Sequence, residues 1–141
     1  MALEAAAVRA GAGFPETQKI LVVDDSGAMR RIVVRTLREA GFSNAQILEA
    51  PDGAQALELA RRELPDAVVT DWNMPVMDGL CLIRALRAAN LGGLCGLVTS
   101  DVGGVRTEAL AAGAQFVLAK PVTADGLRAA LGELCGTEAP S

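Results

Sequence analysis

Short apolar runs alternate along the chain with longer stretches in which apolar residues recur every three or four positions. The runs are continuous and rich in β-branched residues, which is typical of strands covered on both faces of a sheet. They predict five strands, at residues 19–25, 46–50, 66–71, 95–100 and 115–120. The periodic stretches predict five helices, at residues 26–41, 53–64, 80–89, 105–113 and 123–134.

Polar residues and glycines mark the ends of several of these helices. Ser26, Asp52 and Thr123 stand at helix starts, where a side-chain oxygen can accept a hydrogen bond from the first turn. Gly41 and Gly113 stand at helix ends, where a left-handed residue is favoured. The alternation predicts an α/β fold with a single five-stranded parallel sheet, flanked by five helices and joined by right-handed connections.

Glycine is expected to weaken two parts of this fold. Gly96 lies inside the strand predicted at residues 95–100, where it contributes no side chain to the packing. The adjacent Gly103 and Gly104 precede the helix predicted at residues 105–113. Because glycine is a poor helix former, we expect this region to be loose.

Polar side chains gather at the carboxyl ends of four predicted strands. These side chains are Asp24 and Asp25, Asp71, Thr99 and Ser100, and Lys120. The carboxyl ends of parallel strands meet at one edge of the sheet, and sheets of this kind bind ligands there. Singly, each residue has a simpler explanation, such as a helix cap or a surface charge. Their coincidence at successive strand ends predicts one site.

Three converging carboxylates repel one another, so at least one would hold a raised pKa unless a cation compensates. Two or three carboxylates without softer ligands suit Mg²⁺, which keeps water molecules and leaves positions for a phosphate oxygen. Lys120 adds a point charge suited to a phosphoryl group. The constellation therefore predicts a Mg²⁺ site that also binds a phosphoryl anion.

Composition narrows the classes of function. The chain has 141 residues, 51% of them hydrophobic, which fits one folded domain at residues 18–135 between a flexible leader (1–17) and a tail (136–141). Thirteen basic and seventeen acidic residues give a formal net charge of −4, which disfavours direct binding to nucleic acid. The sequence shows neither a secretory signal nor an apolar run of membrane-spanning length. We therefore expect a cytoplasmic protein without membrane contact.

Cysteine and histidine content sharpen this picture. Cys81, Cys95 and Cys135 share no ligand-type spacing, which favours reduced thiols over a metal site or disulfides, with a regulatory thiol as the alternative. The chain contains no histidine, which removes the commonest general base and the Ser-His-Asp triad.

Four motifs carry a family resemblance: VVDDSGAMRRIV, DWNMPVMDG, LVTS and AKP. In order and spacing, they resemble the receiver domain of bacterial two-component response regulators, most closely the CheY-like chemotaxis regulators. The resemblance covers about residues 19–134. It implies a flavodoxin-like sheet with strand order 2-1-3-4-5.

The resemblance also implies the chemistry. Asp71 would take a phosphoryl group from a histidine of a sensor histidine kinase or phosphotransfer protein, forming an acyl phosphate. Asp25, Asp71 and the backbone carbonyl of Asn73 would hold Mg²⁺, with Asp24 acting mostly through water. Lys120 would help to spread the charge of the transition state.

Further roles follow from the same resemblance. Thr99 would turn toward the new phosphoryl group, and the small Ser100 would leave the entry path open. Asn73 and Asp101 would tune the removal of the phosphoryl group by water. The bond between Lys120 and Pro121 is expected to be cis.

One position departs from the family pattern. Many receivers have an aromatic residue three positions before the conserved lysine, and its rotation follows the switch hydroxyl. Here that residue is Val117, and Phe116 is one position away. A shift of one residue along a strand points a side chain to the opposite face, so we expect no aromatic switch.

The resemblance favours a stand-alone signalling switch that acts through a downstream protein target and modifies only itself. A receiver cut from a longer regulator is one alternative. A Mg²⁺-dependent aspartyl phosphohydrolase is another, but it would place its nucleophile on the first strand in an Asp-x-Asp pattern, whereas Asp24 and Asp25 are adjacent. A scaffold that has lost phosphorylation is disfavoured because every site position is filled.

Overall fold

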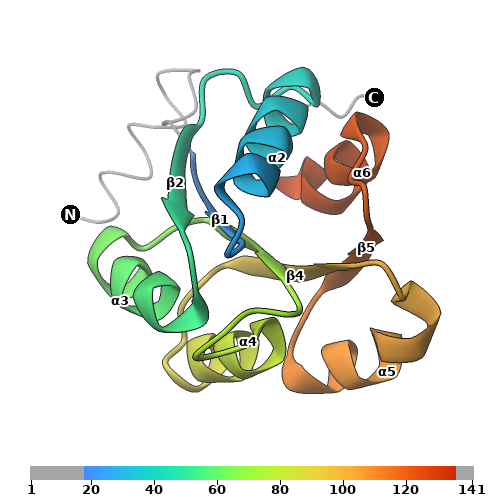
Figure 1. Cartoon of the computed structure of the whole chain (residues 1–141). Coiled ribbons are helices and arrows are strands. Elements are labelled where there is room, and N and C mark those ends of the chain that lie inside the picture. Colours follow the sequence, from blue (N-terminus) through green and yellow to red (C-terminus); the bar gives the residue numbers. More distant parts are fainter. Residues whose placement is uncertain (1–17, 136–141) are drawn as a thin grey trace.

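Five parallel strands form the centre of the computed structural model, which describes residues 18–135 (Figure 1). The strands are β1 (Lys19–Val23), β2 (Gln46–Ala50), β3 (Ala67–Asp71), β4 (Leu94–Thr99) and β5 (Phe116–Ala119). Their order in the sheet is β2-β1-β3-β4-β5, which confirms the predicted flavodoxin-like topology. The leader and the tail predicted at residues 1–17 and 136–141 lie outside the described residues.

Five helices connect and cover these strands. They are α2 (Gly27–Glu39), α3 (Gly53–Glu63), α4 (Gly79–Ala88), α5 (Val102–Ala112) and α6 (Ala124–Cys135). Figure 1 shows α2 and α6 on one face of the sheet and α3, α4 and α5 on the other. Within residues 18–135, none of the helices has the length and apolar character needed to cross a membrane.

Each face of the sheet has its own hydrophobic layer. Ile20 and Val22 of β1 belong to the layer beneath α2 and α6, whereas Leu21 and Val23 belong to the layer beneath α3, α4 and α5. All four side chains are at most 1% exposed. Burial on both faces explains why the strands are continuous apolar runs in the sequence.

The predicted helix caps are present. Each of the three side chains accepts a hydrogen bond from the backbone N–H three residues later, at 3.2 Å for Ser26, 2.8 Å for Asp52 and 3.0 Å for Thr123. Gly41 and Gly113 follow the ends of α2 and α5 with φ angles of +114° and +111°. These left-handed conformations match the prediction made from glycine at helix ends.

The prediction for the start of α5 was wrong by three residues. The helix begins at Val102, and Gly103 and Gly104 lie within its first turn. The Asp101 side chain caps it by accepting a hydrogen bond from the Gly104 N–H at 3.1 Å. This cap extends the helix into a segment that glycine content alone predicted to be loose.

Gly96 has a packing role that the sequence did not predict. Strand β4 runs through it and pairs with both β3 and β5. A Cβ atom at this position would lie 2.0 Å from the ring of Phe116, its partner on β5. The glycine therefore provides the space that the aromatic ring fills.

Candidate functional site

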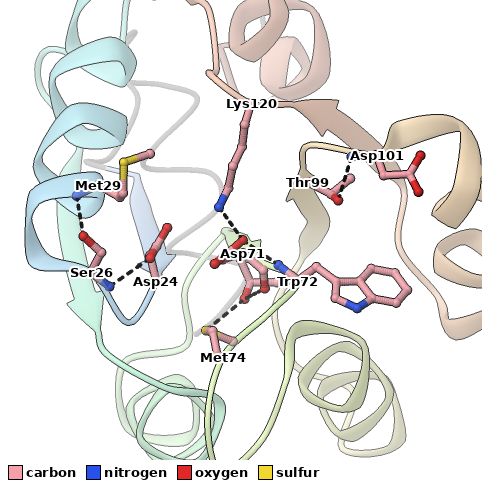
Figure 2. A network of polar contacts seen from close by, with 10 residues as sticks. Asp24, Ser26, Met29, Asp71, Trp72, Met74, Thr99, Asp101 and Lys120 are labelled. Atoms are coloured by element: carbon pink, nitrogen blue, oxygen red, sulfur yellow. Dashed lines mark hydrogen bonds and ion pairs between the residues drawn. The ribbon is translucent and has the colours of Figure 1, made fainter.

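The carboxyl ends of four strands, and the residues that follow them, bring Asp24, Asp25, Asp71, Thr99 and Lys120 to one edge of the sheet. Asp71 is the last residue of β3 and Thr99 the last of β4. Strands β1 and β5 end before the residues predicted as their last. Asp24 and Asp25 therefore follow β1, and Lys120 follows β5. Figure 2 shows the Lys120 side chain reaching down to Asp71, with Asp24 beside this pair.

Three carboxylates form a compact acidic cluster. One oxygen each of Asp24, Asp25 and Asp71 lies within 4.8 Å of the other two. Asp24 and Asp71 are buried, with 5% and 6% exposure, whereas Asp25 is exposed. The cluster is therefore closed toward the sheet and open toward solvent.

Asp71 is held by contacts to a single oxygen. Its Oδ1 accepts a hydrogen bond from the Trp72 N–H at 2.9 Å and lies 2.8 Å from the Lys120 Nζ. Among the residues that the structure describes, no group donates a hydrogen bond to Oδ2. One oxygen thus fixes the carboxylate while the other remains free to react or to bind.

Backbone packing sets the position of Asp71. Thr70 is fully buried, and its hydroxyl donates a hydrogen bond to the Asp71 carbonyl at 2.9 Å. Gly79, the first residue of α4, lies so close that a Cβ atom there would be 2.2 Å from the same carbonyl oxygen. The close approach explains why α4 begins with glycine.

Within the cluster, the pKa of Asp24 is raised above its ordinary value. Burial raises the pKa of its carboxyl, and the charges of Asp71 and Asp25 raise it further. The Ser26 N–H, which donates to Asp24 Oδ1 at 2.9 Å, and the Lys120 charge oppose this shift in pKa. The protonated form is thus favoured relative to a free carboxyl, as expected where a cation is needed for compensation.

The donor set fits a hard divalent cation. It consists of carboxylate oxygens, and its open side would admit water and a phosphate oxygen, as Mg²⁺ requires. Asn73, the other predicted ligand, is exposed in the loop two residues after Asp71. Ser100 is also exposed, immediately after β4.

Thr99 lies at the same edge but is directed elsewhere. Its side chain is buried, and its Oγ1 accepts a hydrogen bond from the Asp101 N–H at 3.1 Å (Figure 2). The Thr99 carbonyl accepts from the Lys120 N–H at 3.0 Å, which joins the ends of β4 and β5. The bond between Lys120 and Pro121 is cis, as expected.

Val117 and Phe116 point to opposite faces of the sheet, as predicted. Val117 packs in the layer beneath α3, α4 and α5, whereas Phe116 packs beneath α2 and α6. The face that would hold an aromatic switch residue therefore holds valine.

Sequence reasoning missed three features around the site. Asp78 caps α4 by accepting a hydrogen bond from the Cys81 N–H at 2.9 Å, which its place before Gly79 could have indicated. Arg30 donates to the Asp24 carbonyl at 2.6 Å and pairs with Glu49 at 2.9 Å, and no motif indicated these contacts.

The third feature is an apolar pocket beside the acidic cluster. It lies between α2 and the loop after β5, and its lining includes Asp71, Lys120, Met29, Ile32, Val33, Pro121 and Val122. Apolar side chains thus border one side of a strongly charged site.

Several known proteins are similar to this chain in sequence and in fold. The chain is 42% identical over 124 residues to the chemotaxis protein CheY-3 of Vibrio cholerae, which covers 84% of this chain and 92% of that protein. The structure of the Vibrio cholerae chemotaxis protein CheY4 superposes with a TM-score of 0.74 at 31% identity, covering 84% of this chain and 99% of the other.

A further structure contains an ion. The receiver domain of the sensor histidine kinase PA1611 from Pseudomonas aeruginosa has a magnesium ion coordinated in its active site cleft. It is similar with a TM-score of 0.74 at 30% identity, covering 86% of this chain and all of the other. Residues 20–132 match the response regulator receiver domain. This chain therefore belongs to the family of response regulator receiver domains.

Proposed function

We propose that this chain is a switch that a histidine kinase operates by transferring a phosphoryl group to Asp71 in the presence of Mg²⁺. The observation that carries the proposal is the acidic cluster, in which three carboxylate oxygens lie within 4.8 Å and Lys120 Nζ lies 2.8 Å from Asp71 Oδ1. One edge of the sheet thus carries the nucleophile, the metal ligands and a cation for the phosphoryl oxygens.

The reacting atom is Oδ2 of Asp71. As it bonds to phosphorus, the bond from phosphorus to the donor imidazole nitrogen breaks, and the electron pair leaves with the imidazole. The contacts from Trp72 and Lys120 to Oδ1 hold the carboxylate still during this exchange. The Lys120 ammonium then faces the transferred oxygens and stabilises their charge.

Asp25, Asp71 and the backbone carbonyl of Asn73 would hold Mg²⁺, with Asp24 acting through water. Bound Mg²⁺ supplies positive charge that offsets the carboxylates and the phosphoryl oxygens. The raised pKa of Asp24 supports this assignment, because its carboxylate is costly to hold without a cation.

Thr99, Ser100, Asn73 and Asp101 complete the proposed site. The Thr99 hydroxyl turns to the phosphoryl oxygens after transfer, and the exposed Ser100 leaves the approach open. Asn73 and Asp101, two residues after Asp71 and Thr99, set how readily water removes the phosphoryl group. Apart from gaining and losing this phosphoryl group, the chain catalyses no reaction on a separate substrate.

The proposed function implies a phosphoryl donor, a downstream target and a cellular compartment. The phosphoryl donor is a sensor histidine kinase or a phosphotransfer protein, and the apolar pocket beside Asp71 offers it a contact surface. Output passes through a downstream protein target, with chemotaxis as the proposed pathway. The free thiols of Cys81 and Cys95 suit the cytoplasm. Residues 18–135 form the proposed receiver unit.

Intact-mass measurement tests the proposal. Incubation with acetyl phosphate and Mg²⁺ should add one phosphoryl group, which hydroxylamine removes and EDTA prevents. Asp71→Asn should abolish the adduct, whereas Asp125→Asn, which alters a carboxylate side chain that is 95% exposed, should retain it. An adduct that persists in Asp71→Asn would refute the assignment. Steady turnover of many phosphate esters would favour the hydrolase instead.

A further inference from the structure

Two hydrogen bonds in series connect the site to helix α5. The Asp101 N–H donates to Thr99 Oγ1 at 3.1 Å (Figure 2). The Asp101 carboxylate accepts from the Gly104 N–H at 3.1 Å. The first bond holds the backbone of Asp101 and the second caps the helix. The hydroxyl of Thr99 therefore determines where the cap of α5 lies.

This cap needs glycine at one position and not at its neighbour. A Cβ atom on Gly104 would lie 2.3 Å from the Asp101 Oδ2, whereas a Cβ atom on Gly103 would meet nothing within 4 Å. The chain thus leaves room for the Asp101 carboxylate where the cap requires it.

The first turn of α5 is only lightly packed: Val102 and Val105 contact the core beneath it but are not fully buried. Ala109, near the other end, is the helix's only buried residue. The cap therefore adds to this limited packing in keeping the first turn ordered.

The usual route for a signal from Thr99 is also missing. Val117 fills the place of an aromatic switch residue and has no ring whose rotation could follow the hydroxyl. Within residues 18–135, the Thr99 hydroxyl takes part in one hydrogen bond, the one from the Asp101 N–H.

We propose that Asp101 couples phosphorylation of Asp71 to the first turn of α5. The inference rests on the proposed function, in which Thr99 turns toward the phosphoryl group. When the hydroxyl turns, it leaves the Asp101 N–H, the Asp101 carboxylate shifts from Gly104, and the first turn opens. The surface of α5 then differs between the two states, without any aromatic rotation.

Amide exchange measured by NMR tests the coupling directly. The probe is Mg²⁺ with beryllofluoride, a non-covalent mimic of the phosphoryl group, and binding is verified by shifts of the Trp72 amide that Asp71→Asn abolishes. The amides of Gly104 and Val105 should exchange about fivefold faster with the probe bound, as for loss of a typical helix cap. Unchanged or slower exchange with the probe bound would overturn the coupling.

Two neighbouring substitutions form a matched pair. Gly104→Ala should displace the Asp101 carboxylate, so that the first turn exchanges rapidly without the probe and gains little when it binds. Gly103→Ala leaves the cap in place, so that its exchange should be slower at rest and should still rise with the probe. Equal behaviour of the two variants would also overturn the coupling.

Intact-mass data separate the two proposals. If the wild-type chain forms no acyl phosphate with acetyl phosphate and Mg²⁺, the proposed function fails. If it forms the adduct while the first turn of α5 shows no change in exchange, only the coupling through Asp101 fails.

Discussion

Helices α4 and α5 leave the same edge of the sheet, α4 after the loop that follows Asp71 and α5 directly after β4. Each begins with an aspartate whose carboxylate accepts a hydrogen bond from the N–H three residues later. The distance is 2.9 Å for Asp78 in α4 and 3.1 Å for Asp101 in α5. By capping alone, the two helices would be equally stable.

Their packing is very different. Helix α4 buries five residues, namely Gly79, Leu80, Leu82, Ile83 and Leu86, whereas α5 buries only Ala109. Burial therefore fixes α4 more firmly than α5 beside the site. Helix α4 supports Asp71, whereas the light packing of α5 would allow it to respond to Thr99, as the proposed coupling requires.

The largest expected effect comes from removing leucine side chains from the two helices. Leu82→Ala in α4 deletes a side chain that is 0% exposed and should lower the free energy of unfolding by about 2–5 kcal/mol. Leu110→Ala in α5 deletes one that is 44% exposed and should change it by about 0.5 kcal/mol or less. Urea titration followed by circular dichroism measures both. Similar losses would show that α5 is as firmly packed as α4.

Added methyl groups should separate the two helices in sign. In Gly79→Ala the new methyl meets the Asp71 carbonyl and the Leu97 side chain, at 2.2 and 2.7 Å, and should cost about 1–3 kcal/mol. In Gly103→Ala the methyl meets nothing within 4 Å and should stabilise the helix by about 1 kcal/mol. Thermal unfolding gives both signs. A neutral Gly79→Ala would show that the loop after Asp71 yields easily.

The contrast between these helices was only partly predictable from sequence. Strands buried on both faces are continuous apolar runs, and parallel strands must place their carboxyl ends together, so the sheet and the meeting of Asp24, Asp71 and Lys120 could be predicted. Both features depend on local pattern and on the geometry of the fold.

Features that depend on contacts between distant residues were not predictable. The fit of the Phe116 ring over Gly96 joins two strands, and the direction of the Arg30 side chain toward the Asp24 carbonyl depends on the finished loop. The early start of α5 was missed because the Asp101 cap outweighs the poor helix propensity of Gly103 and Gly104.

Removing either cap should destabilise its own helix by a similar free energy. The effect on the global unfolding of the protein should differ between the two. Asp78→Ala and Asp101→Ala each delete a cap worth about 1 kcal/mol. In α4 the loss should appear in global unfolding, because the helix is part of the core. In α5 it should appear mainly as faster amide exchange in the first turn, with a smaller change in the urea midpoint. A full global loss from Asp101→Ala would contradict the view of α5 as locally movable.

The smallest expected effect concerns the core beneath the two helices, where the reactivity of a buried thiol should not change. Cys95 of β4 is 0% exposed, and burial raises the pKa of its thiol to about 11, so it should resist iodoacetamide at pH 8. Cys81 of α4 is exposed and should react, although a hydrogen bond to the Asp78 carboxylate raises its pKa and slows alkylation.

Peptide mapping after alkylation distinguishes these two thiols. If only the first turn of α5 opens, Cys95 should stay unmodified with and without Mg²⁺ and beryllofluoride, while Cys81 reacts at the same rate in both states. Urea should expose both and serves as the positive control. Modification of Cys95 that appears only with beryllofluoride would mean that the sheet itself opens, because the thiol cannot react while β4 stays packed beneath α4. That result would contradict the view that α4 is fixed while the first turn of α5 moves.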